Sequence, residues 1–541
     1  MAAEPPVWIF TNGRIITNNH DIPRAEAMVV GHEKIRWIGR REELPAIYKT
    51  GAVVRDLKGC TVLPGLIDAH LHVEGLGRSL EELNFVGSTS YEELIQMVAA
   101  AAAAAPPGNW IHGRGWDQNN WPESRMPDHR ALSAVSPAHP VYLRRIDGHA
   151  ALVNQKALDI GSITKTTAEP AGGRILKTSA GEVLGVLIDE AMSLVNFHIP
   201  APAAAVRRRR VEKGLAECAR YGLTMVHDAG ADHLGLEIYQ SLRTTNRLPI
   251  RAYVMIEGSE AGLLDEWLLR GPLLDSADRL IIRAVKLYAD GALGSRGAAL
   301  LEPYADEPGT RGLLMMEADS LETLLRRIHR AGFQCAVHAI GDRANHLLLD
   351  LYEKILGAEI LGGKPGRDPR HRIEHAQIIA PGDIGRFAAL GVVASMQFTH
   401  ATSDWTWVAN RIGRGRLPGA YAWRSISRAG ARLAQGSDAP IESPNPFPGL
   451  AAGISRQDAD GNPKGGWLPH ECLTPAEALG AATTGAAQAA FLEDRLGRLQ
   501  EGCWADFVLC DTDPLTEPAS SIRKTQVEET WVGGKCVYRR G

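Results

Sequence analysis

The chain has 541 residues, of which 45% are hydrophobic and 23% are charged, and its formal net charge is −4. This length exceeds one small core and predicts about two to four domains, or one large barrel with additions. The near balance of acidic and basic residues excludes a strongly basic nucleic-acid-binding protein, and the sequence contains no run of about 18 apolar residues that would predict a membrane span.

The first 62 residues are predicted to form short antiparallel strands. The segments VWIFTNGRIIT and AEAMVVGHEKIRWIG are rich in β-branched and aromatic residues and contain Asn-Gly and Gly-His turns. Residues 491–541 have the same texture, so we expect the two chain ends to form the halves of one small β-sandwich. The N-terminal residues do not join a basic segment to a long apolar run, so no export signal is expected.

Between these ends, from residue 63 to residue 490, strand-like apolar runs alternate with helix-length segments. This alternation predicts an α/β fold of repeated strand-helix units, and eight units close a (β/α)8 TIM barrel. In that fold the loops at the carboxyl ends of the strands build the active site. The eight runs are residues 65–73, 223–230, 250–258, 280–291, 333–342, 370–377, 391–398 and 431–440.

The interval between the first and second runs is far longer than one helix and two loops. It holds about 150 residues, so residues 78 to about 205 are predicted to form an inserted subdomain. The chain also contains seven widely scattered cysteines without a CxxC pair. Reduced thiols in a cytoplasmic protein are the simplest interpretation of that pattern.

His70 and His72 stand at the end of the first run, in PGLIDAHLH. Residues i and i+2 of a strand share one face, so both imidazoles are expected to point into the barrel mouth and can hold one cation. The alternative is a pair of polar residues that close a strand, or a hydrogen-bonded core histidine.

Four further ionisable residues end other predicted strands: Lys286, His338, His375 and Asp438. Burial of Lys286 in an apolar run lowers its pKa, and a neutral amine can react with carbon dioxide to give a carbamate that bridges two metal ions. A salt bridge to Asp290 or another carboxylate is the alternative for this lysine. The two histidines could instead be satisfied inward residues, and the aspartate could close the barrel through hydrogen bonds.

In this order, the motifs resemble those of the amidohydrolase superfamily, and specifically of its amidohydrolase-3 branch, which includes N-substituted formamide deformylase. The matching motifs are PGLIDAHLH, KLYADGALGSRGAALLEPY, HAIGDRA, RIEHAQ, GSDAPIESPNPF and RRIDGHAALVN. They extend from about residue 60 to residue 450, and the β-rich ends fit the flanking sandwich of the family. The resemblance therefore covers nearly the whole chain.

The resemblance implies a metal-dependent hydrolase. It assigns His70, His72 and Asp438 to one metal ion and His338 and His375 to a second, with Lys286 as a carbamate between them. We expect one or two Zn²⁺ ions, with Mn²⁺ or Fe²⁺ as alternatives, and a one-ion site does not require the carbamate. The expected reaction is attack of a metal-activated hydroxide on an amide-like C–N bond of N-acyl, N-formyl or carbamate type, with the aspartate as proton shuttle.

Two polar groups are expected to contact a small-molecule substrate. The first lies in the insertion and the second in the glycine-rich loop after the lysine: Arg145, Asp147 and His149, then Asp290, Ser295 and Arg296. For the first group, spacing alone is equally typical of a turn at Asp147 and Gly148. Glu374 lies next to a predicted ligand in the chain, and strand alternation predicts that it points away from the lumen and has a structural role.

Two rival functions remain. A barrel-shaped binding or scaffold protein without catalysis would be expected to have lost a ligand or the proton-shuttling aspartate, whereas this sequence has all six residues. A hydrolase of esters or lactones on the same site is not distinguished by the fold. We expect no nucleic-acid or membrane partner, and the sequence leaves a homo-oligomer open.

Overall fold

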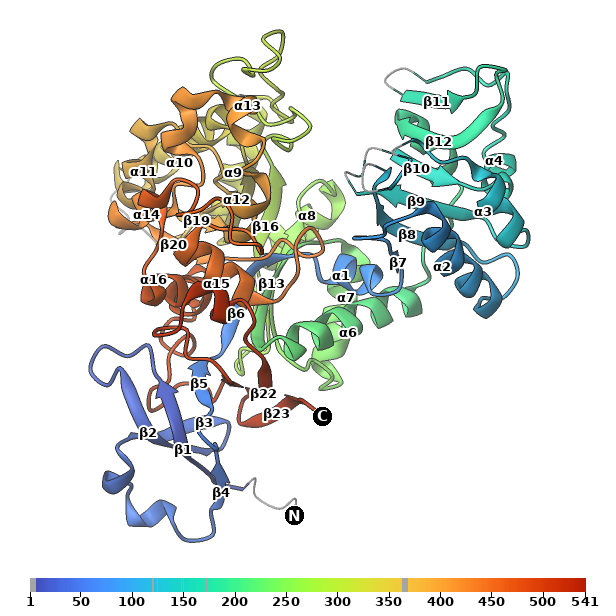
Figure 1. Cartoon of the computed structure of the whole chain (residues 1–541). Coiled ribbons are helices and arrows are strands. Elements are labelled where there is room, and N and C mark those ends of the chain that lie inside the picture. Colours follow the sequence, from blue (N-terminus) through green and yellow to red (C-terminus); the bar gives the residue numbers. More distant parts are fainter. Residues whose placement is uncertain are drawn as a thin grey trace. The chain divides into compact units, whose positions relative to one another are not determined.

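The computed structural model of the chain describes residues 6–118, 121–123, 125–146, 148, 150–170, 173–361 and 368–541 (Figure 1). Residue contacts divide it into two compact units, one formed by Met1–Val73 with Val211–Gly541 and the other by Glu74–Arg210. Among the described residues, no helix combines the length and the apolar character needed to cross a membrane.

Eight parallel strands form the barrel of the first unit. Each hydrogen-bonds to its neighbour along the series. Seven lie within predicted runs and β13 extends one residue beyond its run, so the predicted barrel is confirmed. The strands are β6 (Leu66–Leu71), β13 (Leu223–Ala231), β14 (Arg251–Glu257), β16 (Leu280–Tyr288), β17 (Gln334–Ala339), β18 (Arg372–His375), β19 (Val393–Met396) and β20 (Arg432–Gln435).

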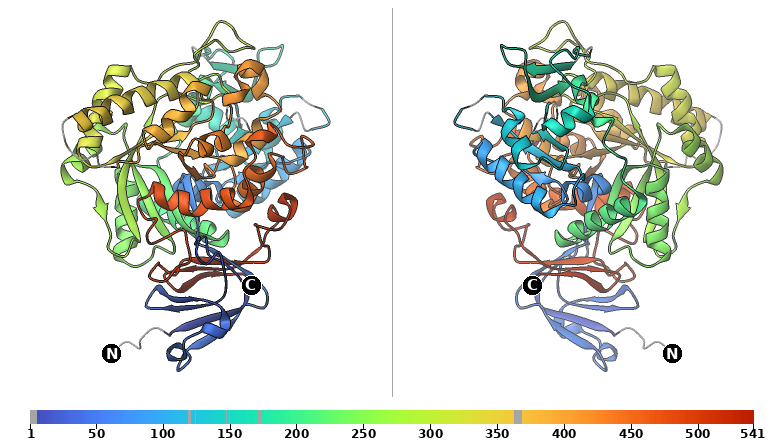
Figure 2. Two further views of the ribbon diagram at one scale, coloured as in Figure 1. Left: turned by 90° about the vertical axis from the view of Figure 1, so that its left-hand side faces the viewer. Right: turned by 90° about the vertical axis from the view of Figure 1, so that its right-hand side faces the viewer.

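Helices surround these strands (Figure 2). They include α7 (His233–Thr244), α8 (Ala261–Arg270), α9 (Ala318–Arg330), α10 (Asp342–Leu361), α11 (Ile384–Ala389) and α14 (Trp423–Arg428). Helix α9 shows why they pack this way, because Leu321, Leu325 and Ile328 recur at helical spacing and are fully buried. Its opposite face carries arginines and acidic residues, which remain in solvent.

The ring of strands closes between β6 and β20 through backbone hydrogen bonds around the carboxyl ends of the two strands. The Asp438 amide donates to the His70 carbonyl at 2.7 Å, and the His72 amide donates to the Ala439 carbonyl at 2.8 Å. Gly436 permits this close approach, since a Cβ atom there would lie only 2.5 Å from the His70 nitrogen. Backbone closure therefore brings the predicted aspartate to the predicted histidine pair.

The two chain ends, predicted as the halves of one β-sandwich, come together in one eight-stranded sheet (Figure 2). Its strands are β1 (Trp8–Ile16), β2 (Arg24–Gly31), β3 (Lys34–Gly39), β4 (Val53–Asp56), β5 (Thr61–Pro64), β21 (Phe507–Cys510), β22 (Val527–Val532) and β23 (Lys535–Arg539). The junction of the two ends is the antiparallel pairing of β21 with β5. Phe10, Phe507 and Trp531 pack ring against ring there, with centroids 5.0–5.5 Å apart.

The large insertion predicted after the first barrel strand is confirmed, because the second unit lies between β6 and β13 in the chain. It contains a six-stranded sheet in the order β11-β12-β10-β9-β8-β7. The bounds are β7 (Leu83–Asn84), β8 (Ile111–Trp116), β9 (Val141–Arg145), β10 (Ala150–Val153), β11 (Gly173–Lys177) and β12 (Val183–Asp189), with α2 (Tyr91–Ala104), α3 (His129–Val135) and α4 (Gln155–Ile160).

Candidate metal centre

Three of the six predicted ligands form a compact group at the closure of the barrel. The Nε2 atoms of His70 and His72 lie 3.6 and 3.5 Å from Oδ1 of Asp438. Ligands bound at about 2.1 Å in a tetrahedral zinc site are about 3.4 Å apart, so these three atoms have the spacing of an ion-binding group. The donor set of two imidazoles and one carboxylate also suits a divalent transition metal.

The orientation of His70 is fixed by a buried carboxylate. Its Nδ1 lies 2.5 Å from Oε2 of Glu374, and both side chains are fully buried. This contact leaves Nε2 as the nitrogen available to an ion, which is the usual arrangement of a metal-binding histidine. The pKa of His70 is lowered to about 4, mainly by burial and secondly by the positive charge of the nearby Lys286. The imidazole is therefore neutral at neutral pH.

Glu374 belongs to a buried charge network. The Arg372 guanidinium donates to both of its oxygens, at 2.7 and 3.0 Å, and also to the carbonyl of Ala69 and the hydroxyl of Ser395. Burial alone would raise the pKa of Glu374, but the guanidinium and the bond to His70 hold it well below its usual value. The carboxylate is therefore charged and able to orient the imidazole.

The prediction that Glu374 points away from the lumen is wrong. Strand alternation fails at the end of β18, where His375 has a φ of 74° and Ala376 a φ of 43°. This left-handed turn directs His375 toward the ion-binding group while Glu374 remains in the lumen beside His70. Asp438 has a φ of 58°, so two predicted ligands occupy backbone conformations that cost stability and are concentrated at functional sites.

The remaining predicted ligands lie on the adjacent side of the barrel mouth. The rings of His338 and His375 have centroids 4.5 Å apart, and those of His375 and His70 are 4.9 Å apart. His375 Nδ1 lies 2.7 Å from Oε1 of Gln397, which leaves its Nε2 for an ion. The pKa of His338 is lowered to about 3, mainly by burial and secondly by the charge of Lys286. Burial also holds the pKa of His375 well below its usual value.

Lys286 is also part of this cluster. Its Nζ lies 3.4 Å from His70 Nε2, the side chain is buried, and burial lowers its pKa. Within the described part of the chain, no carboxylate lies within 4.0 Å of Nζ, so the alternative of a salt bridge to Asp290 is excluded. Instead, Asp290 accepts hydrogen bonds from the backbone amides of Ala299, Ile340 and Gly341 at 2.8–2.9 Å.

His400 is a member of the site that the sequence interpretation missed. It lies in the short helix α12 (Phe398–Asp404), which begins two residues after β19. Its Nε2 is 4.0 Å from Oδ2 of Asp438, and the ligand atoms of His375, His400 and Asp438 all lie within 4.8 Å of one another. A signal for it exists in the sequence, because His400 lies only four residues after the end of β19, in the segment that follows a barrel strand.

The predicted substrate-binding residues are placed as follows. In the second unit, the Arg145 guanidinium donates to Asp117 at 2.6 Å and to Gln118 at 2.9 Å. In the first unit, Ser295 is exposed, and Arg296 pairs with Asp306 at 3.0 Å. The other two members of the insertion group, Asp147 and His149, lie outside the described residues. Substrate contact by any of these residues stays a prediction.

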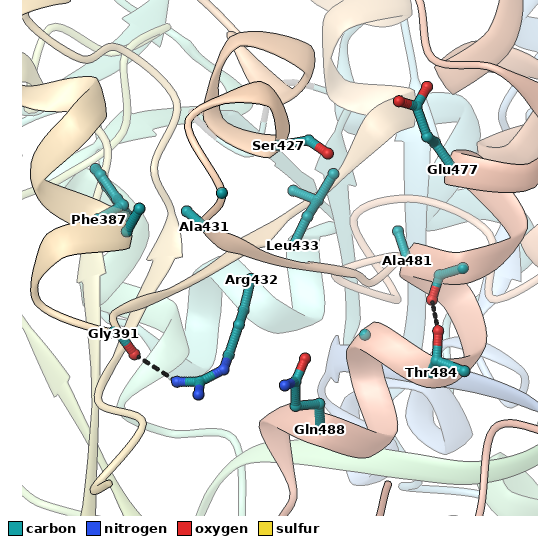
Figure 3. Close-up of a pocket in the computed structure, with 14 residues that line it drawn as sticks. Phe387, Gly391, Ser427, Ala431, Arg432, Leu433, Glu477, Ala481, Thr484 and Gln488 are labelled. Carbon is teal, nitrogen blue, oxygen red and sulfur yellow. Dashed lines mark hydrogen bonds between the residues drawn. The ribbon is translucent and has the colours of Figure 1, made fainter.

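A pocket lies at the start of β20, at the opposite end of that strand from Asp438. Figure 3 shows Arg432 there, with its guanidinium directed toward the Gly391 carbonyl and Gln488 beside it. Asp368 also accepts from this guanidinium, at 2.7 Å. Because the amino-terminal face of such barrels contributes stability and the opposite face contributes catalysis, the histidine cluster is the candidate active site.

Known proteins are similar to this chain in sequence and in architecture. The sequence profile described as "Amidohydrolase family" matches residues 53–538. The chain belongs to the amidohydrolase family. Protein LONG AFTER FAR-RED 3 of Arabidopsis thaliana is 34% identical over 98% of this chain and 91% of its own length. The N-substituted formamide deformylase of Arthrobacter pascens is 27% identical over 95% of each protein.

A solved structure supports the same assignment. The crystal structure of an uncharacterized metal-dependent hydrolase from Pyrococcus horikoshii OT3 superimposes with a TM-score of 0.78 at 28% identity, covering 95% of this chain and 99% of that one. As an amidohydrolase, the chain belongs to a superfamily of metal-dependent hydrolases, which agrees with the ion-binding spacing of His70, His72 and Asp438.

Proposed function

We propose that this amidohydrolase cleaves an amide-like C–N bond of N-acyl, N-formyl or carbamate type, releasing an amine. The observation that carries the proposal is the convergence of His70, His72, His338, His375, Lys286 and Asp438 at the carboxyl ends of the barrel strands. The relationship to an N-substituted formamide deformylase supports C–N bonds as the target.

The residues suit one or two divalent ions, with zinc as the expected metal. His70, His72 and Asp438 would hold the first ion, while His338, His375 and a carbamate on Lys286 would hold the second. When bound, such ions polarise the scissile carbonyl and make water more acidic. Support for the carbamate comes from the buried amine of Lys286, whose lowered pKa favours the neutral form that reacts with carbon dioxide.

Asp438 is the proposed proton shuttle. Its two oxygens have different surroundings, because Oδ1 faces His70 and His72 while Oδ2 faces His400 at a distance too long for a direct hydrogen bond. Burial alone would raise the pKa of Asp438, but the neighbouring histidines hold it well below its usual value. The carboxylate can therefore take the proton of the attacking water through Oδ2 and give it to the leaving nitrogen.

The test is a substrate screen of the zinc-loaded protein. N-acyl, N-formyl and carbamate compounds are incubated with the protein and free amine is measured, with the metal-stripped protein and Asp438→Asn as controls. The proposal expects amine release that requires both the metal and the aspartate. Turnover of esters and lactones alone would favour the rival hydrolase, and a protein that binds no zinc, manganese or iron would favour the scaffold.

A further inference from the structure

His400 occupies the barrel mouth without a defined role in metal binding. Its Nε2 is buried and has no hydrogen-bond partner among the described residues. Most buried polar atoms do have a partner, so this nitrogen requires an explanation. A charged atom, Oδ2 of Asp438, lies 4.0 Å from it. A buried imidazole nitrogen that faces the proposed proton shuttle, and that no protein group satisfies, is suited to a bound molecule.

We propose that His400 is a catalytic residue whose Nε2–H donates a hydrogen bond to the acyl oxygen of the substrate. This inference rests on the proposed function and adds a group that stabilises the charge formed on that oxygen. Water adds to the carbonyl carbon, the π electron pair moves to the acyl oxygen, and Asp438 takes the proton of the water. The C=O bond then re-forms, the C–N bond breaks, and the proton passes from Asp438 to the amine nitrogen.

The spacing of the two groups fits this division of roles. A separation of 4.0 Å is too long for a direct hydrogen bond, but it allows the two oxygens of one tetrahedral carbon to lie side by side. One oxygen then contacts Asp438 Oδ2 and the other contacts His400 Nε2. A hydrogen-bond donor stabilises the acyl oxygen, because that oxygen gains negative charge during the reaction. The same donor placed on the attacking water would make that water less reactive.

The helix that carries His400 is held in place before any substrate binds. Phe398, Ala401 and Thr402 of α12 are buried, and the Phe398 ring packs on Trp423 with centroids 4.7 Å apart. Ser403 also donates to Glu442 at 2.8 Å, which ties the helix to the loop after Asp438. A donor fixed in this way needs little reorganisation during the reaction, which is the condition for effective stabilisation of a developing charge.

Ligation of a metal ion is the main competing role for His400. Its ligand atom lies within 4.8 Å of those of His375 and Asp438. However, its separation from the carboxylate is 4.0 Å, whereas His70 and His72 lie 3.6 and 3.5 Å from the same residue, closer to the spacing of tetrahedral ligands. The two roles differ in their effect on metal content, so one experiment separates them.

The experiment compares His400→Ala, His400→Gln and the control His233→Ala, which changes an exposed histidine of α7. For each protein we measure bound zinc per chain, kcat and KM on whichever acyl compound the wild type hydrolyses, and the affinity for methylphosphonate as a tetrahedral anion. We expect His400→Ala to keep its zinc, to lose about 100-fold or more in kcat with little change in KM, and to bind methylphosphonate at least about tenfold more weakly.

His400→Gln should recover part of kcat, because its amide can donate a hydrogen bond, and His233→Ala should match the wild type. Loss of zinc from His400→Ala would overturn the proposal in favour of a ligand role. An unchanged kcat, or an unchanged affinity for methylphosphonate, would also overturn it. The outcome is separate from that of the proposed function, because ester hydrolysis forms the same oxyanion and the phosphonate assay requires no turnover.

Discussion

Replacing Glu374 by glutamine tests whether the buried charge network positions the metal centre. The change keeps the side-chain volume but removes the negative charge that accepts two hydrogen bonds from Arg372 and contacts His70. Breaking a fully buried ion pair costs about 3–5 kcal/mol. Arg372 keeps the Ala69 carbonyl, the Ser395 hydroxyl and His227 as partners, so we expect a loss near the lower end, about 3 kcal/mol.

The same substitution should weaken metal binding. The amide cannot orient the His70 imidazole as the carboxylate does, and loss of such a partner reduces metal affinity by about 10–100-fold. Stability is measured by urea denaturation of the metal-free protein, and zinc affinity by competition with a chelating dye. Glu353→Gln is the matched control, because that carboxylate also pairs with an arginine but is 65% exposed. Wild-type stability and zinc affinity in Glu374→Gln would refute the reasoning.

Three further predictions concern the chemistry and the charge state of the site. Asp438→Asn should retain most of its metal while turnover falls at least about a hundredfold, because the proton carrier is lost; metal analysis and initial rates check this, and near-normal turnover would contradict the role. Protein prepared without carbon dioxide should regain activity when bicarbonate is added, whereas indifference to bicarbonate with two bound ions would count against a carbamate on Lys286. The metal-free protein should lose stability as the pH falls from about 6.5 toward 4, because His70, His338 and His371 have folded pKa values of about 4, 3 and 3 and take up protons on unfolding. Burial raises the pKa values of Asp68 and Asp290 to about 7 and that of Asp404 to about 6, and it also raises that of Asp342, so these carboxylates act in the opposite direction. The histidines outnumber them, because burial also lowers the pKa values of His112, His227 and His375, so a urea midpoint that rises on acidification would contradict this balance.

The barrel could be predicted from the sequence because parallel strands buried on both faces are continuous apolar runs with clear ends. Strand β13 shows this, because seven of the eight residues that follow Leu223 in it are buried. The predicted run also matches the strand closely. The positions of the predicted ligands follow from the same rule, because polar residues at the carboxyl ends of such strands lie at the barrel mouth.

The sequence predictions that fail for Glu374 and His400 do so because of local backbone features that residue alternation and spacing do not reveal. The prediction for Glu374 fails because the positive φ of His375, which breaks the two-residue period of the strand, leaves no mark in the sequence. His400 was missed because it belongs to a helix after the strand. The hydrogen-bond partners of Asp290 are a further feature that the sequence does not reveal, because its carboxylate accepts from three backbone amides of other segments, which only the tertiary structure brings together.

The most direct test of the metal centre is anomalous diffraction from crystals of the zinc-loaded protein, with data collected on both sides of the zinc absorption edge. We predict a peak about 2.1 Å from both His70 Nε2 and His72 Nε2 and in contact with Asp438. A fully loaded protein with no anomalous peak among these three side chains would contradict the account.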